Sequence, residues 1–250
     1  MSEEIMNNFA NFEFKTPLVE GLIKSRPNRF IMNTEVNNNI EKCHCPTTGK
    51  IGNIVFKDVP CLLSKSENIG RKTPYTVEAF LREYGKKDQC KSWIGINQTA
   101  VNRYVEHFLR AGLFNDAGEP VLREQTLGSS RLDFRVGRCY IEVKMPLFYL
   151  FSKTESLNGQ APTSLDRFIR HVGDLRNSLK DNCRAILLTC FMFDAPRFVP
   201  PAPSDRNIDA VNTVKQSLAR GVEIWQLNLA INQNGVDFVR CFDISSTVID

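Results

Sequence analysis

Residues 130–144, SRLDFRVGRCYIEVK, alternate apolar and polar side chains on both sides of a glycine. Side chains along a strand point to opposite faces with period two, so each half predicts a strand with one apolar face. Gly137 at the first loop position suits the two-residue turn of a β-hairpin. The segment therefore predicts an antiparallel hairpin, and its expected buried pairs are Val136–Cys139, Phe134–Ile141 and Leu132–Val143.

The same register places Asp133 directly opposite Glu142 on the polar face, with Lys144 on that face two residues later. Like charges at paired positions destabilise a sheet, and a cation between them would offset the repulsion. Two interpretations stay open. The hairpin is either a surface element, whose charges pair diagonally with each other and with Arg131, or a site that binds a positive ligand.

Two carboxylates and a lysine on adjacent strands are the minimum set for metal-assisted phosphodiester hydrolysis. Mg²⁺ or Mn²⁺ prefers carboxylate oxygens, lowers the pKa of a bound water and polarises a phosphate. We expect Asp133 and Glu142 to bind the metal. Lys144 would orient the attacking water or neutralise phosphate charge, and Glu124 is a candidate third catalytic carboxylate.

The composition is that of an ordinary globular protein, with 42% hydrophobic and 24% charged residues among 250. A formal net charge of +4 means that nucleic-acid affinity must come from a local basic patch. No basic region followed by an apolar run opens the sequence, and the longest apolar stretch, 185–193, is too short to span a membrane. We therefore expect a soluble cytoplasmic protein with no membrane partner.

Eight cysteines raise the questions of disulfides and of zinc. A chain of this size without an export signal does not favour a disulfide framework. Zinc sites commonly use CxxC pairs, whereas this sequence offers Cys43-His44-Cys45 with scattered partners. The cysteines are therefore expected to be small buried residues.

Between Leu18 and Leu63 short strand-like pieces alternate with turn signals: LVEGLIKS, RFIMNTEV, IGNIVF and PCLLS. This pattern predicts a small β-barrel or a curled sheet. The polar segment Arg82–Ser92, rich in glycine and lysine, is the expected connection to a second part. The predicted domains are residues 1–90 and 91–250.

The second part mixes helices with strands. A helix is predicted over 97–113, capped by Thr99 and ended by Gly112, and another over 163–179, opened by Thr163 and Asp166. A continuous apolar strand follows at 184–193. The remaining predicted elements are a helix at 208–220, ended by Gly221, and strands at 222–231 and 237–244. The order predicts an α/β sandwich, so that the whole chain is α+β.

The Asp…Glu-x-Lys arrangement resembles the core of the PD-(D/E)xK nuclease superfamily. Over about residues 22–224 the chain also resembles the sugar fermentation stimulation protein family. The matching pieces are LIKSRPNRF, HCPTTGK, LLSKSENIGRKTPYT, IGIN with Asn102-Arg103, SRLDF, YIEVK, Arg167 with His171, and GVEI. Departures from the family pattern fall at Thr47, Lys50, Met145-Pro146 and Ile169.

The resemblance implies an OB-like N-terminal barrel that binds nucleic acid and a restriction-endonuclease-like C-terminal domain. It also implies DNA binding and a regulatory effect on sugar use. Asp133, Glu142 and Lys144 fall on the nuclease-like triad, and Glu124 on the acidic residue that precedes it. Activity stays open, because a DNA-binding regulator that keeps the acidic residues without cleaving DNA is the alternative to a Mg²⁺- or Mn²⁺-dependent nuclease.

Basic residues that lie among small donors and an aromatic side chain suit phosphate contacts and occasional base stacking. A solvated loop or an exposed helix face is the simpler interpretation of the same residues. The expected DNA contacts are Lys24, Arg26, Arg29, Lys65, Arg71, Lys72, Arg103, Arg167 and His171. Single or double strands, DNA or RNA, and a homodimer or a monomer stay open.

Overall fold

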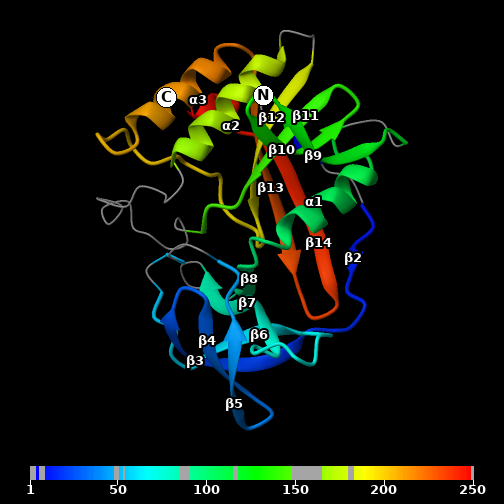
Figure 1. The fold of residues 1–250 in the computed structure, drawn as a ribbon, viewed down its shortest axis with the longest axis vertical. Coiled ribbons are helices and arrows are strands. Elements are labelled where there is room, and N and C mark those ends of the chain that lie inside the picture. The colour runs from blue at the N-terminus through cyan, green and yellow to red at the C-terminus, as the bar shows by residue number, and fades with distance from the viewer. Residues whose placement is uncertain are drawn as a thin grey trace.

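Figure 1 shows the computed structural model of the chain. It describes residues 4–5, 9–47, 51–52, 54–84, 90–114, 118–147, 165–179 and 183–248. The strands form a six-stranded sheet, in the lower part of the view, and an eight-stranded sheet above it. The two sheets share one apolar core, which runs from the interior of the smaller sheet to one face of the larger.

The smaller sheet closes into a barrel. Its strands, in sheet order, are β5 (Asn39–His44), β4 (Ile31–Val36), β3 (Val19–Asn28), β6 (Val59–Lys65), β7 (Tyr75–Tyr84) and β8 (Cys90–Gly95). A parallel pairing of His44 with Thr76 joins β5 to β7, which closes a ring of five strands and leaves β8 along β7. Fully buried side chains such as Ile23, Met32 and Phe80 fill the interior. The predicted OB-like barrel is confirmed.

One local prediction within the barrel is wrong. Residues 51–52 and 54–56 of the IGNIVF segment lie in no strand, although Ile51 and Phe56 are buried. The strand lies earlier, as β5, because Asn37 and Asn38 form a hairpin turn with φ of 49° and 64°. Asparagine tolerates this left-handed conformation, which suits Asn37 and Asn38 to the two-residue turn.

The described ends of the expected connection at 82–92 lie in two paired strands instead. Arg82 pairs with Ser92, and Tyr84 pairs with Cys90, so the chain leaves the barrel only after Gly95. The segments β1 (Glu4–Ile5) and β2 (Phe12–Glu13) pair with the last strand of the larger sheet. The division into residues 1–90 and 91–250 stays a prediction, to which the structure adds this return of the N-terminal segments.

The larger sheet has the strand order β1-β14-β13-β12-β11-β10-β9, with β2 also on β14. Its longer strands are β9 (Val121–Leu127), β10 (Ser130–Val136), β11 (Cys139–Lys144), β12 (Arg184–Phe191), β13 (Glu223–Ile231) and β14 (Gly235–Asp243). The central strands β11, β12 and β13 are parallel, and the flanking strands are antiparallel. β12 is buried along almost its whole length, as its apolar run predicts.

Helices cover both faces of this sheet, and η4 (Ser245–Val248) is a short 3₁₀ helix near its end. α2 (Leu165–Ser178) and α3 (Ile208–Leu218) lie side by side on one face (Figure 1), where Val172 packs with Leu187. α1 (Val101–Arg110) packs on the other face through Phe108, within the shared core. The predicted α/β sandwich is confirmed. In the described part of the chain no helix is long and apolar enough to cross a membrane.

The ends of α1 correct one detail of the sequence prediction. Thr99 does not cap the helix; the side-chain oxygen of Asn97 accepts hydrogen bonds from the backbone N–H groups of Thr99 and Ala100, both at 3.1 Å. Gly112 follows the helix with φ of 106°, as expected for a helix stop. Thr163, expected to open α2, lies outside the described residues.

The described cysteines are free, and all except Cys183 are buried. Burial raises the pKa of the Cys61 and Cys139 thiols to about 12. Thiols of this kind are protonated at neutral pH and behave as small apolar side chains. The expectation of buried structural cysteines is confirmed for these residues.

Candidate acidic site

The register of the central hairpin is confirmed near its turn. Val136 pairs with Cys139 and Phe134 with Ile141, and Gly137 has a φ of 53°. Among the described residues, the pairing of β10 with β11 ends there. The predicted direct pairing of Asp133 with Glu142 is therefore wrong.

The reason is a change of face in β10. Leu132 packs in the core beneath α2 and α3, whereas Phe134 packs in the core on the opposite side. A regular strand would place both on one face, so the predicted shared face does not hold. Glu124, which lies opposite Asp133 in β9, has a φ of 53°, so the neighbouring strand is distorted at the same level.

Asp133 uses both carboxylate oxygens at this break in the ladder. Its Oδ2 accepts the backbone N–H of Val143 at 2.8 Å, and its Oδ1 accepts the side-chain amide of Asn102 at 2.7 Å. Burial raises the pKa of Asp133, and the negative charge of Glu142 raises it further, against the opposing effects of the Val143 hydrogen bond and Lys144. The bond to the Val143 N–H places the Asp133 carboxylate beside the backbone of the residue that follows Glu142.

Glu142 is almost completely buried, with 1% of its surface exposed. Its Oε1 accepts hydrogen bonds from His171 Nδ1, at 2.6 Å, and from the Lys144 ammonium. Burial acts to raise the pKa of Glu142, but the bonds from His171 and Lys144 outweigh it, so the pKa lies below its usual value. Its Oε2 is buried without a hydrogen-bond partner among the described residues. An unpaired buried carboxylate oxygen is costly, and a cation would satisfy it.

His171 contacts the Glu142 carboxylate, and Arg167 contacts His171 in turn. Arg167 is exposed, and its Nε donates to His171 Nε2 at 3.3 Å. In this arrangement His171 carries its proton on Nδ1 and donates it to Glu142. His171 itself is only 3% exposed, so the expected direct contact with DNA is corrected to a contact with Glu142.

The structure brings together Asp133, Glu142 and Lys144, as the sequence predicts, but not Glu124. The Glu124 side chain is 61% exposed and pairs with Arg131 at 2.6 Å. Sequence reasoning missed Asn102 as a partner of Asp133. The apolar stripe of α1 identifies its buried face, but it does not show which polar side chain at the edge of that face reaches the sheet.

The basic residues of β3 and its turn are engaged within the barrel. Lys24 pairs with Asp58 at 2.8 Å and with Glu35 at 3.1 Å, and the hydrogen bond to Asp58 is the main cause that raises its pKa. Arg26 donates to the Thr47 hydroxyl at 3.1 Å. Arg29 is exposed and lies over the Phe30 ring at 4.7 Å. Of these residues, Arg29 is the best placed for an external anion.

The loop between β6 and β7 presents a different picture. Lys65, Arg71 and Lys72 are exposed, and none of the ion pairs found in the described ranges involves them. The loop is closed by a hydrogen bond from the Ser66 N–H to the Pro74 carbonyl at 2.8 Å. The expected contact Arg103 is also exposed, on α1, and lies over the Phe12 and Tyr104 rings.

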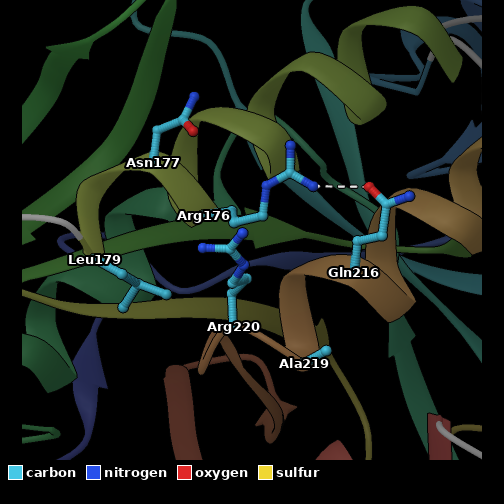
Figure 2. A pocket seen from close by; sticks show the side chains of 6 residues that line it. All are labelled: Arg176, Asn177, Leu179, Gln216, Ala219 and Arg220. Atoms are coloured by element: carbon cyan, nitrogen blue, oxygen red, sulfur yellow. Dashed lines mark hydrogen bonds between the residues drawn. The ribbon is translucent and has the colours of Figure 1, made fainter.

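A cavity of about 660 Å³ lies between the ends of α2 and α3, and Figure 2 shows the residues that line it. Its lining residues are Arg176, Asn177, Leu179, Gln216, Ala219 and Arg220. Arg176 donates to Gln216 at 2.9 Å across the cavity. In the described part of the chain none of these residues makes a hydrogen bond or ion pair with Asp133 or Glu142, so this cavity is not part of the candidate site.

Comparisons with known proteins identify relatives over nearly the whole chain. Residues 25–96 match the family model described as the SfsA N-terminal OB domain, and residues 99–235 match the sugar fermentation stimulation protein RE domain. A sugar fermentation stimulation protein homolog of Synechococcus sp. (strain JA-3-3Ab) is 30% identical, over 89% of this chain and 91% of its own. One of Teredinibacter turnerae is also 30% identical, over 87% and 93%.

A solved structure shows the same fold. It is described as the structure of Pyrococcus furiosus SfsA in complex with Ca²⁺, and it matches with a TM-score of 0.68 at 20% identity. The match covers 92% of this chain and 96% of the other. Two domain models in the expected order and full-length relatives at this identity leave no other assignment: the chain belongs to the sugar fermentation stimulation protein family.

Proposed function

We propose that this protein binds DNA and hydrolyses phosphodiester bonds at a divalent-metal site formed by Asp133 and Glu142. One observation carries the proposal: the buried Oε2 of Glu142 has no partner among the described residues, and the Asp133 carboxylate contacts the backbone of the next residue, Val143. Two close carboxyl groups with an unsatisfied oxygen favour a cation between them.

The donor set fits Mg²⁺ or Mn²⁺. Both carboxylates offer the hard oxygens that these ions prefer, and an ion that keeps several waters needs few protein ligands. Within the described ranges no group of three or more His, Cys, Asp or Glu side chains is placed to hold a metal, so water would have to complete the coordination of an ion held by Asp133 and Glu142. The Ca²⁺ complex of the Pyrococcus furiosus relative supports a divalent ion here. When bound, such an ion would lower the pKa of a water and polarise a phosphate.

The surrounding residues would prepare the ligands. Asn102 and the Val143 amide fix the orientation of Asp133, while His171 occupies one oxygen of Glu142 and leaves the other for the ion. The Lys144 side chain is 32% exposed, so its ammonium can face both Glu142 and a phosphate. Such fixed outer partners commonly set metal affinity.

The exposed cations of the β6–β7 loop would bind the nucleic acid. Phosphate contacts from lysine and arginine give affinity and position without reading the sequence. They do not distinguish single from double strands or DNA from RNA, because every form carries the same backbone phosphates. DNA is the partner that the family resemblance implies.

A DNA-binding regulator that does not cleave is the second candidate. The burial of Glu142, at 1% exposure, and the ion pair that holds Lys144 favour it, since a closed site has little room for a phosphate. The two candidates share the barrel surface and differ in whether metal and substrate enter the acidic site.

Thermal unfolding with and without Mn²⁺ tests the metal site. A ligand that binds only the folded chain stabilises it by about 2.7 kcal/mol at a hundredfold excess over Kd. Asp133→Asn and Glu142→Gln should each remove most of that gain, because each replaces a charged ligand. Lys144→Ala should keep most of it and abolish cleavage, because lysine acts on the water or the phosphate.

Cleavage is measured by incubating the purified chain with single- and double-stranded DNA and with RNA, in Mg²⁺, Mn²⁺ or EDTA. Metal-dependent products that disappear in Lys144→Ala support the nuclease. If millimolar Mn²⁺ does not change the melting temperature of the wild-type chain and no nucleic acid is cleaved, the protein is a non-catalytic regulator.

A further inference from the structure

Glu78 is a buried carboxylate of the barrel that the proposed chemistry does not use. It lies on β7 and is only 5% exposed. Its Oε1 accepts the hydroxyl of Ser64 at 2.6 Å, and its Oε2 accepts the side-chain amide of Asn97 at 2.7 Å. Ser64 belongs to the barrel, but Asn97 lies beyond its last strand, so Glu78 connects the barrel to the segment that leaves it.

Asn97 connects Glu78 to the start of α1. While its Nδ2 donates to Glu78, its Oδ1 accepts the N–H groups of Thr99 and Ala100 and the hydroxyl of Thr99. A single amide is thus fixed at both ends, to the barrel and to the first turn of the helix. A side chain that satisfies the free N–H groups at a helix start sets where that helix begins.

α1 in turn reaches the acidic site. Asn102, the second residue of the helix, donates to Asp133 Oδ1 at 2.7 Å. The short connection before the helix is held on both sides, because the N–H of Ile96 donates to the Glu78 carbonyl at 2.8 Å and Gln98 donates to the Met145 carbonyl at 3.0 Å. Each step from Glu78 to Asp133 is therefore a hydrogen bond or a single helical turn.

We propose that Glu78 is a positioning residue for the metal site, acting through Asn97 and Asn102 on Asp133. The inference rests on the proposed function, since it concerns the same pair of carboxylates. It adds a physical connection by which a buried group of the barrel sets metal affinity in the other sheet. By thermodynamic reciprocity, metal binding would also favour the arrangement of the barrel in which this connection is intact.

The test is a double-mutant cycle on Mn²⁺ affinity, measured by titration calorimetry on the full chain. Glu78→Met keeps the side-chain volume and removes both acceptors, and Asn102→Ala removes the last hydrogen bond. We expect Mn²⁺ to bind about fivefold more weakly to Glu78→Met and about tenfold more weakly to Asn102→Ala. If Glu78 acts through Asn102, the double variant binds about tenfold more weakly, not about fiftyfold.

Two further variants separate positioning from general damage. Glu78→Gln should restore wild-type affinity, because its oxygen can accept from Asn97 while its amide donates to the Ser64 hydroxyl. Ser64→Ala removes the other hydrogen bond of the same carboxylate and leaves Asn97 in place, so it should not change Mn²⁺ affinity. If Glu78→Met does not fold, Asn97→Ser replaces it, since serine keeps an oxygen for the helix but does not reach Glu78.

The outcomes are distinct. Non-additive losses with recovery in Glu78→Gln support the inference. Multiplicative losses, or a loss in Ser64→Ala equal to that in Glu78→Met, overturn it and leave the metal site standing. A wild-type chain that binds no Mn²⁺ overturns the proposed function and this inference with it.

Discussion

The barrel and the larger sheet present the charges of their candidate functional residues in opposite ways. The barrel presents Lys65, Arg71 and Lys72 to solvent, without an acidic partner among the described residues. The larger sheet holds Asp133 and Glu142 inside, where hydrogen bonds occupy three of the four carboxylate oxygens. The barrel therefore has exposed cations without acidic partners among the described residues, and the larger sheet has buried carboxylates held by hydrogen bonds.

This difference matches two physical tasks. Attraction of a polyanion works over a Debye length and needs no defined geometry. Hydrolysis needs donors and ligands held in place before the substrate arrives. Exposed cations therefore suit capture, buried carboxylates suit chemistry, and the short path from β8 through Asn97 to α1 holds the two regions in register.

The largest expected effect comes from breaking the contact between the two regions. A Cβ on Gly95 would lie 2.5 Å from the Cβ of Met192, where the Gly95 N–H also donates to the Met192 carbonyl at 3.2 Å. Gly95→Ala forces the barrel away from the sheet, because an atom so near the backbone cannot rotate aside. We expect about 2–3 kcal/mol of lost stability in urea unfolding.

Gly70→Ala is the matched control, because the nearest atom to its added Cβ is the flexible Asn68 side chain at 3.5 Å. It should change the unfolding free energy by less than about 0.5 kcal/mol. Equal stabilities of the two variants would show that β8 does not approach the sheet as closely as the structure has it.

The next effect concerns the fixed charges. His171→Ala leaves the buried Glu142 with Lys144 as its remaining donor among the described residues, which should cost about 2 kcal/mol in the absence of metal. His171→Asn places an amide donor near the position of Nδ1 and should recover much of this loss. Denaturant unfolding in EDTA measures both variants. If His171→Asn loses as much stability as His171→Ala, the effect comes from the space left by the imidazole ring and not from the lost hydrogen bond.

The sequence predicted the parts of this site that follow from strand periodicity. Alternation along one hairpin predicted that Asp133, Glu142 and Lys144 lie near one another, and the contacts of Asp133 with the Val143 N–H and of Lys144 with Glu142 agree with this. It did not show that β10 changes face at Asp133, because the change depends on packing against helices distant in sequence. For the same reason the ion pair of Glu124 with Arg131 was not predicted.

Residues from outside the hairpin were harder to assign. The contact of Asn102 with Asp133 and that of His171 with Glu142 depend on how α1 and α2 are rotated over the sheet. The apolar stripe of a helix shows which side faces the sheet, but because the stripe is wide it gives the rotation about the helix axis only approximately. In the barrel, the hairpin turn at Asn37 and Asn38 was not predicted, and one strand therefore lies earlier than expected without changing the predicted architecture.

The loose charges give a smaller effect, on binding rather than on stability. Arg71→Ala with Lys72→Ala should weaken DNA binding for all sequences and flatten its salt dependence by up to about two units of log–log slope. Lys24→Ala is the matched control, because its ammonium is already paired with Asp58 and Glu35. Fluorescence anisotropy over a series of salt concentrations measures both variants. Equal slopes for the two variants would remove the β6–β7 loop from the DNA path.

The smallest effect is a pH dependence at the edge of that loop. Burial lowers the pKa of His44, and the nearby Arg71 charge lowers it further. A histidine whose pKa is lower in the folded state contributes stability above its unfolded value, about 6.5, and loses it as the pH falls through the folded value. His44→Gln should therefore reduce the fall in unfolding free energy between these two pH values. Arg71→Ala should reduce it in part, because it removes the positive charge that lowers the His44 pKa. Urea unfolding at neutral and mildly acidic pH measures the difference. A wild-type acid sensitivity that both variants retain in full would place its origin elsewhere, among the fixed charges of the larger sheet.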